Sequence, residues 1–119
     1  MPDLTFAQDD RAHFPTKYHG QVSISKIKWN EICQEPERFY YRENAEKIAT
    51  TLINPDYVRY SHNHANQFVY YKRFDTIVIG NREVASKVKV WAVIIDSKTY
   101  RICTVYPTPK VKKGKEFKG

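Results

Sequence analysis

The second half of the chain most constrains the fold, because its residues favour strands almost throughout. Between residues 57 and 106, β-branched and aromatic runs alternate with short polar or glycine-containing links. The runs are YVRYS, NQFVYYKRF, TIVIG, KVKVWAVII and TYRICTVY. The segment NREVAS after TIVIG is typical of a hairpin connection. This pattern predicts four or five antiparallel strands.

The first half carries helix signals instead, after a short alternating segment, QVSIS, that predicts a strand. Ser25 is placed to cap a helix over residues 26–34. Pro36 fits the first turn of a second helix, where its missing N–H costs nothing. Apolar residues at i, i+3, i+4 and i+7 give that helix one stripe: Ala45, Ile48, Ala49 and Leu52. Pro55 disfavours helical dihedrals in the preceding residue and ends it.

Together these signals predict one α+β domain, with two N-terminal helices packed on one face of a four- to five-stranded antiparallel sheet. A chain of 119 residues fits a single domain. Residues 1–20 show no clear periodicity and are predicted to form an arm, residues 21–109 the domain, and residues 110–119 a basic tail. Such an arrangement leaves the other face of the sheet free for a ligand.

The charge favours a polyanionic partner. Twenty Lys and Arg against 13 Asp and Glu give a net charge of +7. Residues 110–119 hold five Lys and one Glu, so they contribute +4 of that total. Positive charge binds nucleic acid because each neutralised phosphate releases condensed counterions. A lysine-rich tail also increases solubility, and charge by itself does not separate these two roles.

No apolar run approaches the roughly 20 residues needed to span a bilayer, and the first residues lack the features of a signal peptide. We therefore expect a cytoplasmic protein without membrane association. Cys33 and Cys103 lie far apart and outside any ligand pattern, which predicts free thiols. His62 and His64 have no carboxylate cluster near them, so we expect neither a metal nor another cofactor.

Candidate binding residues lie on the strand FVYYKRF. Phe68, Tyr70 and Lys72 alternate with Val69, Tyr71 and Arg73, so either face presents a cation beside an aromatic ring. That combination suits RNA, since phosphates meet the charge and bases stack on the ring. The alternative is an ordinary sheet in which the aliphatic stem of the Lys or Arg covers apolar surface.

In the last strand, Tyr100, Ile102, Thr104 and Tyr106 are predicted to share a face. Val105 and Cys103 are typical of core positions, which would leave Thr104 and Tyr106 on the open face, unless they only pack in the sheet. Glu31 and Glu35 stand near the junction of the two helices. Either favours solvent there, or serves as a general base if it reaches the open face.

The order of these signals resembles the barnase/EndoU/colicin/RelE-like group of small phage and toxin nucleases. The resemblance runs from about Val22 to Lys115, and its best parts are NPDYVRYS, YYKR and TVYPTPKVKKGK. It implies two N-terminal helices on a four-stranded antiparallel sheet and metal-independent RNA cleavage. In that reaction the ribose 2′-OH attacks the adjacent phosphorus and leaves a cyclic phosphate.

The chemistry that the resemblance implies needs a base, cations beside the phosphate and an acid for the leaving oxygen. The strand cation corresponds to Lys72, with Arg73 as the neighbouring candidate, and the hydroxyl at the end of the last strand to Thr104, followed by Tyr106. Glu31 and Glu35 stand where the group commonly has histidines. Flanking phosphates and bases would contact Arg59, Tyr70, Lys110, Lys112 and Lys113.

The sequence therefore predicts a toxin-like endoribonuclease, RNA as its substrate and an acidic antitoxin or immunity protein as a further partner. The alternatives are a non-catalytic module of the same fold that binds RNA or a protein, and a structural phage protein. The last alternative leaves the localised charge without a role.

Overall fold

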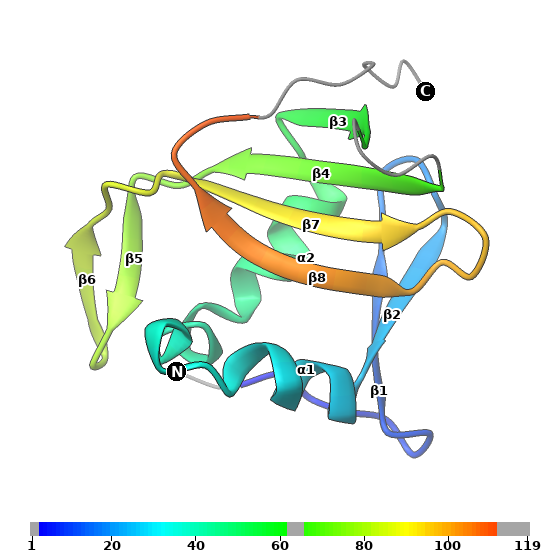
Figure 1. Ribbon diagram of the computed structural model, residues 1–119, viewed down its shortest axis with the longest axis horizontal. Coiled ribbons are helices and arrows are strands. Elements are labelled where there is room, and N and C mark those ends of the chain that lie inside the picture. Colours follow the sequence, from blue (N-terminus) through cyan, green and yellow to red (C-terminus); the bar gives the residue numbers. More distant parts are fainter. Residues whose placement is uncertain (1–2, 62–65, 112–119) are drawn as a thin grey trace.

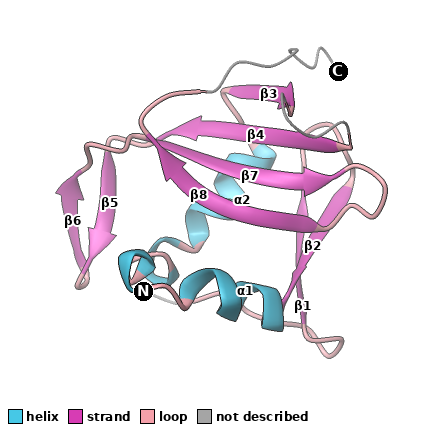
Figure 2. Cartoon of the chain, in the orientation of Figure 1, coloured by secondary structure: helices cyan, strands magenta, loops and turns pink. Residues whose placement is uncertain are grey.

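The computed structural model describes residues 3–61 and 66–111, in which eight strands form three sheets beside a few short helices (Figure 2). The strands are β1 (Arg11–Pro15), β2 (Gln21–Ser25), β3 (Tyr57–Tyr60), β4 (Gln67–Arg73), β5 (Thr76–Ile79), β6 (Arg82–Ala85), β7 (Val90–Asp96) and β8 (Ile102–Thr108). The helices are α1 (Lys26–Cys33), α2 (Glu46–Ile53) and two 3-10 turns, η1 (Pro36–Arg38) and η2 (Arg42–Asn44). His62, His64, Lys112 and Lys113 lie outside the described residues.

The central sheet is antiparallel, with the strand order β3-β4-β7-β8 (Figure 1). Helix α2 lies behind this sheet in the view of Figure 1 and contacts β4 and β7, while α1 contacts β2 and β8. The hairpins β1–β2 and β5–β6 form the two smaller sheets, and β5–β6 projects from one side. The other face of the central sheet has no helix of the described residues over it.

The predicted fold class is wrong, because the described chain is mostly strand and its helices are short. Residues 11–15, expected in an irregular arm, form β1, whose Ala12 and Phe14 are buried and pair with Ile24 and Val22 of β2. The segment after TIVIG is itself a strand, β6, so β5–β6 is a sheet of its own. The protein is thus a set of two-, four- and two-stranded sheets with short helices, and not two helices on one sheet.

The predicted helix signals hold only in part. Ser25 caps α1 as expected, and its Oγ accepts a hydrogen bond from the backbone N–H of Lys28 at 3.0 Å. The second helix is broken, since residues 36–44 contain three consecutive aromatic residues and form 3-10 turns instead. Its apolar stripe survives in α2, where Ile48 and Leu52 are 1% and 0% exposed. These two side chains belong to the main hydrophobic core between the central sheet, the helices and β1–β2.

Strand β8 departs from simple alternation because the β7–β8 register shifts between Ile94 and Ile95. Ile95 pairs with Ile102, and Ile94 with Thr104. Ile102 therefore lies in the main core with Val105, and not on the face of Thr104 as predicted. The strand also continues through Pro107, which an edge strand tolerates.

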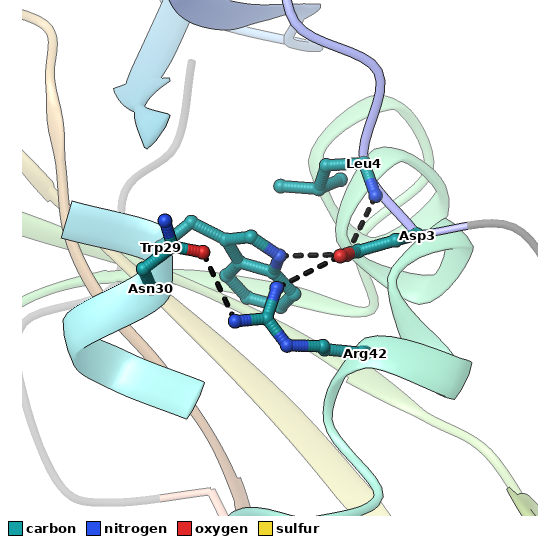
Figure 3. A network of polar contacts seen from close by, with 5 residues as sticks. All are labelled: Asp3, Leu4, Trp29, Asn30 and Arg42. Carbon is teal, nitrogen blue, oxygen red and sulfur yellow. Dashed lines mark hydrogen bonds and ion pairs between the residues drawn. The ribbon is translucent and has the colours of Figure 1, made fainter. Parts of the chain in front are cut away.

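A polar network ties the N-terminal segment to α1 (Figure 3). The indole N–H of Trp29, a fully buried side chain, donates to Asp3 Oδ1 at 2.7 Å. Arg42 bridges Asp3 Oδ2 and Asn30 Oδ1 at 2.8 and 3.0 Å. Because Asp3 and Arg42 are both part-exposed, their ion pair adds little stability. The hydrogen bond of the buried indole is therefore the contact of this network that contributes most to stability.

We therefore expect Asp3→Ala to lower the free energy of unfolding by about 1–2 kcal/mol, since it leaves a buried indole N–H without its acceptor. Urea unfolding followed by circular dichroism measures this difference. Asp9→Ala is the control, because Asp9 forms only exposed contacts with Arg11 and His13; it should change the stability much less than Asp3→Ala does. Equal losses in the two variants would contradict the prediction.

A buried asparagine attaches the β5–β6 hairpin to the body. Asn44 is 1% exposed; its Oδ1 accepts from the backbone N–H of Val78 at 2.8 Å, and its Nδ2 donates to the carbonyls of Val78 and Tyr40 at 2.9 and 2.7 Å. Glu43 beside it accepts from the N–H groups of Gly80 and Asn81, at 2.9 and 3.0 Å. Those two turn residues have positive φ angles of 59° and 64°, as a tight two-residue hairpin turn requires.

Cys33 and Cys103 are free thiols as predicted, and burial raises the pKa of Cys33 to about 11 and that of Cys103 in the same direction. In the part of the chain that is described, no helix has the length and apolar character to cross a membrane.

Candidate nucleic-acid interface

The uncovered face of the central sheet, which we call the open face, carries both aromatic and cationic side chains. Cross-strand register defines its members, because directly paired residues of antiparallel strands point to the same side. One row across the four strands is Tyr57, Tyr71, Ala92 and Tyr106, and the next row is Arg59, Val69, Ile94 and Thr104. Small Ala92 thus separates two tyrosines, and a guanidinium stands at the end of the neighbouring row.

Burial on the open face is uneven. Val69, Tyr71, Val90 and Ala92 form a second hydrophobic cluster, against which Tyr106 and Val111 pack. Tyr57 remains 45% exposed, and the guanidinium of Arg59 lies 5.1 Å from the centre of its ring. Tyr57 is therefore the aromatic ring on this face that offers most surface to a stacking base.

A cavity of about 620 Å³ opens at one end of this face, and we call it the carboxyl-end cavity because it lies beside the carboxyl ends of β4 and β8. Its lining residues are Asp56, Tyr57, Tyr71, Lys72, Arg73, Val90, Pro109, Lys110 and Val111. Three cations thus face one carboxylate. The cavity is an electropositive site with an aromatic wall, which suits a phosphate joined to a planar base.

Asp56 contacts the ammonium of Lys72 and the backbone of Arg73. Its Oδ1 lies 3.6 Å from the ammonium of Lys72, whose side chain is 18% exposed, and its Oδ2 accepts from the backbone N–H of Arg73 at 2.8 Å. The Nε of Arg73 also donates to Asp75 at 3.2 Å. Lys110, which follows β8 and also lines the cavity, is exposed. Asp56 was not predicted from the sequence, although its place before β3 puts it beside the end of the antiparallel partner β4.

The structure brings together some predicted residues and separates others. Lys72, Arg73 and Lys110 share the carboxyl-end cavity, while Arg59, Thr104 and Tyr106 are half-buried on the open face. The predicted convergence of Lys72 with Thr104 is absent. Lys72 pairs with Trp91 and Thr104 with Ile94, so their backbones are offset by about 10 Å along β7, on opposite faces of the sheet.

The two glutamates lie elsewhere. Glu31 and Glu35 line a separate pocket with Gln34 and Pro36, at the carboxyl end of α1. Neither contributes to the carboxyl-end cavity. The prediction that one of them serves as a base on the open face therefore finds no support in their placement. In the described residues, no group of three or more His, Cys, Asp or Glu is placed to hold a metal ion.

The prediction that Tyr70 contacts RNA is wrong, because its side chain is 0% exposed and belongs to the main core. Its hydroxyl is hydrogen-bonded to Nδ1 of His19 and accepts from the backbone N–H of Tyr18 at 3.3 Å. The His19 ring also stacks on Phe68, with centroids 4.0 Å apart. Tyr70 therefore docks the β1–β2 turn onto the sheet and is not available to stack on a base.

His19 should make stability depend on pH. Burial lowers the pKa of its imidazole below the ordinary value of 6.5, so the folded protein binds this proton less readily than the unfolded chain. The free energy of unfolding should consequently fall as the pH drops from about 7.5 to about 5.5. Urea unfolding across this range measures the slope. His19→Gln should flatten it, whereas His13→Gln, at an exposed position, should keep it; equal slopes would contradict the prediction.

The open face and its carboxyl-end cavity therefore combine stacking surface with positive charge, without an assembled acid–base pair among the predicted catalytic residues. The resemblance to the barnase/EndoU/colicin/RelE-like group stays a prediction. Comparison of the chain with protein-family models, with curated proteins and with solved structures gave no match.

Proposed function

We propose that the protein binds single-stranded RNA on the open face. The observation that carries the proposal is the carboxyl-end cavity, where Lys72, Arg73 and Lys110 surround a space walled by Tyr57 and Tyr71. Phosphates bind such cations by counterion release, and an exposed ring next to them receives a base. Cytoplasmic RNA would be the ligand, in keeping with the location expected from the sequence.

Fluorescence anisotropy with a labelled single-stranded RNA tests the proposal. We expect the logarithm of the binding constant to fall linearly with the logarithm of salt concentration, by about 0.7 for each phosphate contacted. A duplex of the same sequence should bind more weakly, because its bases are not free to stack on Tyr57. Tyr57→Ala should remove that preference. The absence of binding at low salt would overturn the proposal.

Endoribonuclease activity is a second candidate, and one observation favours it. Arg59, Thr104 and Tyr106 lie on the same face, in adjacent cross-strand rows. The two hydroxyls of β8 suit proton donation to a leaving oxygen, whereas the guanidinium of Arg59 stands on β3, at the opposite edge of the sheet and about 14 Å away. Such a reaction would leave a cyclic phosphate on one product and a 5′-hydroxyl on the other.

Incubation of RNA with the protein in excess EDTA tests for cleavage, and mass spectrometry of the products identifies the cyclic phosphate. Tyr106→Phe and Thr104→Val remove only the hydroxyl groups, so they should abolish cleavage and leave binding nearly unchanged. Binding without cleavage would reject the enzyme and retain the RNA-binding module. An acidic protein partner, the remaining proposal, would compete with RNA for the same cations in the anisotropy assay.

A further inference from the structure

A second polar cavity, of about 290 Å³, lies at the amino end of β8, and we call it the amino-end cavity. Three cations from separate parts of the chain line it: Arg11 of β1, Lys28 of α1 and Arg101 before β8. They are brought together because β2 lies against the start of β8, where Ser23 forms an isolated parallel bridge with Arg101. One carboxylate, from Asp96, lines the same cavity.

The charges in this cavity are not balanced internally. The carboxylate of Asp96 accepts from the backbone N–H groups of Lys98 and Thr99, at 2.8 and 3.0 Å, and these bonds lower its pKa and fix it in the turn. Arg11 Nε donates to the neutral hydroxyl of Ser23 at 2.8 Å. Within residues 3–61 and 66–111, neither Lys28 nor Arg101 forms an ion pair with a side chain. Three cations against one anion favour an anionic ligand.

Strand β8 connects the two basic cavities. Residues Ile102 and Cys103, at its start, line the amino-end cavity, and Pro109 and Lys110, just past its end, line the carboxyl-end cavity. Seven residues of extended chain separate Ile102 from Pro109, which corresponds to about 23 Å. Thr104 and Tyr106 lie between the cavities, on the open face. Figure 1 shows β8 at the edge of the central sheet, next to β7.

We propose that the amino-end cavity binds a second phosphate of the same RNA strand that occupies the carboxyl-end cavity. This inference rests on the proposed function and adds to it the path of the strand along β8. A separation of about 23 Å calls for a ligand of about five nucleotides or more, which agrees with the roughly 4–16 nucleotides that single-strand platforms cover. A flexible single strand can follow the sheet edge, and a short oligonucleotide cannot reach both cavities.

Anisotropy with labelled oligouridylates of about three and about eight nucleotides tests the path. For the longer RNA, Arg101→Ala and Lys28→Ala should each weaken binding about fivefold and reduce the salt slope by about 0.7. The shorter RNA, held by Arg73 and its neighbours, should respond to neither change. Lys98→Ala is the matched control, since it removes one exposed positive charge from the adjacent turn without altering the lining of either cavity.

The two cysteines give an independent readout in the unmodified protein. Cys103 lines the amino-end cavity, whereas Cys33 contacts the edge of the main core. The longer RNA should slow alkylation of Cys103 by N-ethylmaleimide and leave Cys33 unaffected, as mass spectrometry of peptides would show. The shorter RNA should protect neither thiol.

Three results would overturn the inference. If the longer RNA binds and depends on Arg73 but not on Arg101 or Lys28, the second phosphate site fails and the proposed function stands. If inorganic phosphate and the shorter RNA protect Cys103 as well as the longer RNA does, the cavity binds anions independently and the shared strand fails. If no RNA binds at low salt, the proposed function fails together with the inference.

Discussion

Replacement of Asn44 by alanine is expected to lower the free energy of unfolding by about 3 kcal/mol. The side chain is almost completely buried and makes three hydrogen bonds to the backbone of Val78 and Tyr40. Its removal leaves one buried N–H and two carbonyls without these partners, and each such group costs about 1–3 kcal/mol when no water reaches it. The effect should be the largest of the stability changes considered, because β5 has no strand of the central sheet beside it.

Urea unfolding measures the loss, and hydrogen exchange locates it. In Asn44→Ala the amides of β5 and β6 should exchange much faster, whereas those of β4 and β7 should exchange faster only to the extent that global stability falls. Glu43→Gln is the matched control, since the amide oxygen still accepts one turn N–H and the position is only half-buried. An Asn44 variant whose hairpin stays as protected as the central sheet would show that other contacts hold the hairpin.

The largest functional effect is expected from removing the three cations of the carboxyl-end cavity. The combined variant Lys72→Ala, Arg73→Ala and Lys110→Ala should weaken binding of single-stranded RNA about a hundredfold at low salt and reduce the salt slope by about 2. The reason is that three phosphate contacts are lost from one connected surface. Lys72→Ala also frees the carboxylate of Asp56, which repels phosphate, so this single change should weaken binding more than Lys110→Ala.

A control with the same net charge separates a specific site from general attraction. Arg82→Ala, Lys87→Ala and Lys98→Ala together also remove three positive charges, from exposed positions that line neither cavity. This variant should keep most of the affinity and the salt slope. If both triple variants lose affinity equally, the interaction follows overall charge, and the carboxyl-end cavity is not the binding site.

Local sequence signals predicted the individual elements better than their assembly. The cap at Ser25, the stripe of Ile48 and Leu52 and the strands around Val69, Val93 and Val105 depend on neighbouring residues, and all of them are present. Strand β1 escaped prediction because its alternation covers only five residues and ends in a proline. The fold class was wrong because β1 adds a second sheet, β5–β6 forms a third, and residues 36–44 form 3-10 turns in place of a long second helix.

The candidate site was predictable only where it follows one strand or its end. Lys72 and Arg73 are adjacent in β4, and Lys110 follows β8, so antiparallel pairing brings them to one end of the sheet. Tyr70 could not be assigned, because alternation does not say which side the helices cover. No local sequence pattern predicts the cluster of Arg11, Lys28 and Arg101. These residues meet only because β2 lies against the start of β8, which is a contact between distant parts of the chain.

Pro107 has a consequence for self-association. It stands in β8, an edge strand of the central sheet. Proline lacks the N–H that an incoming strand from another molecule would need to extend a sheet, and natural proteins use it at edges to prevent such growth. Pro107 thus withholds one N–H from any strand that would add to this border, the one that runs beside the two cavities.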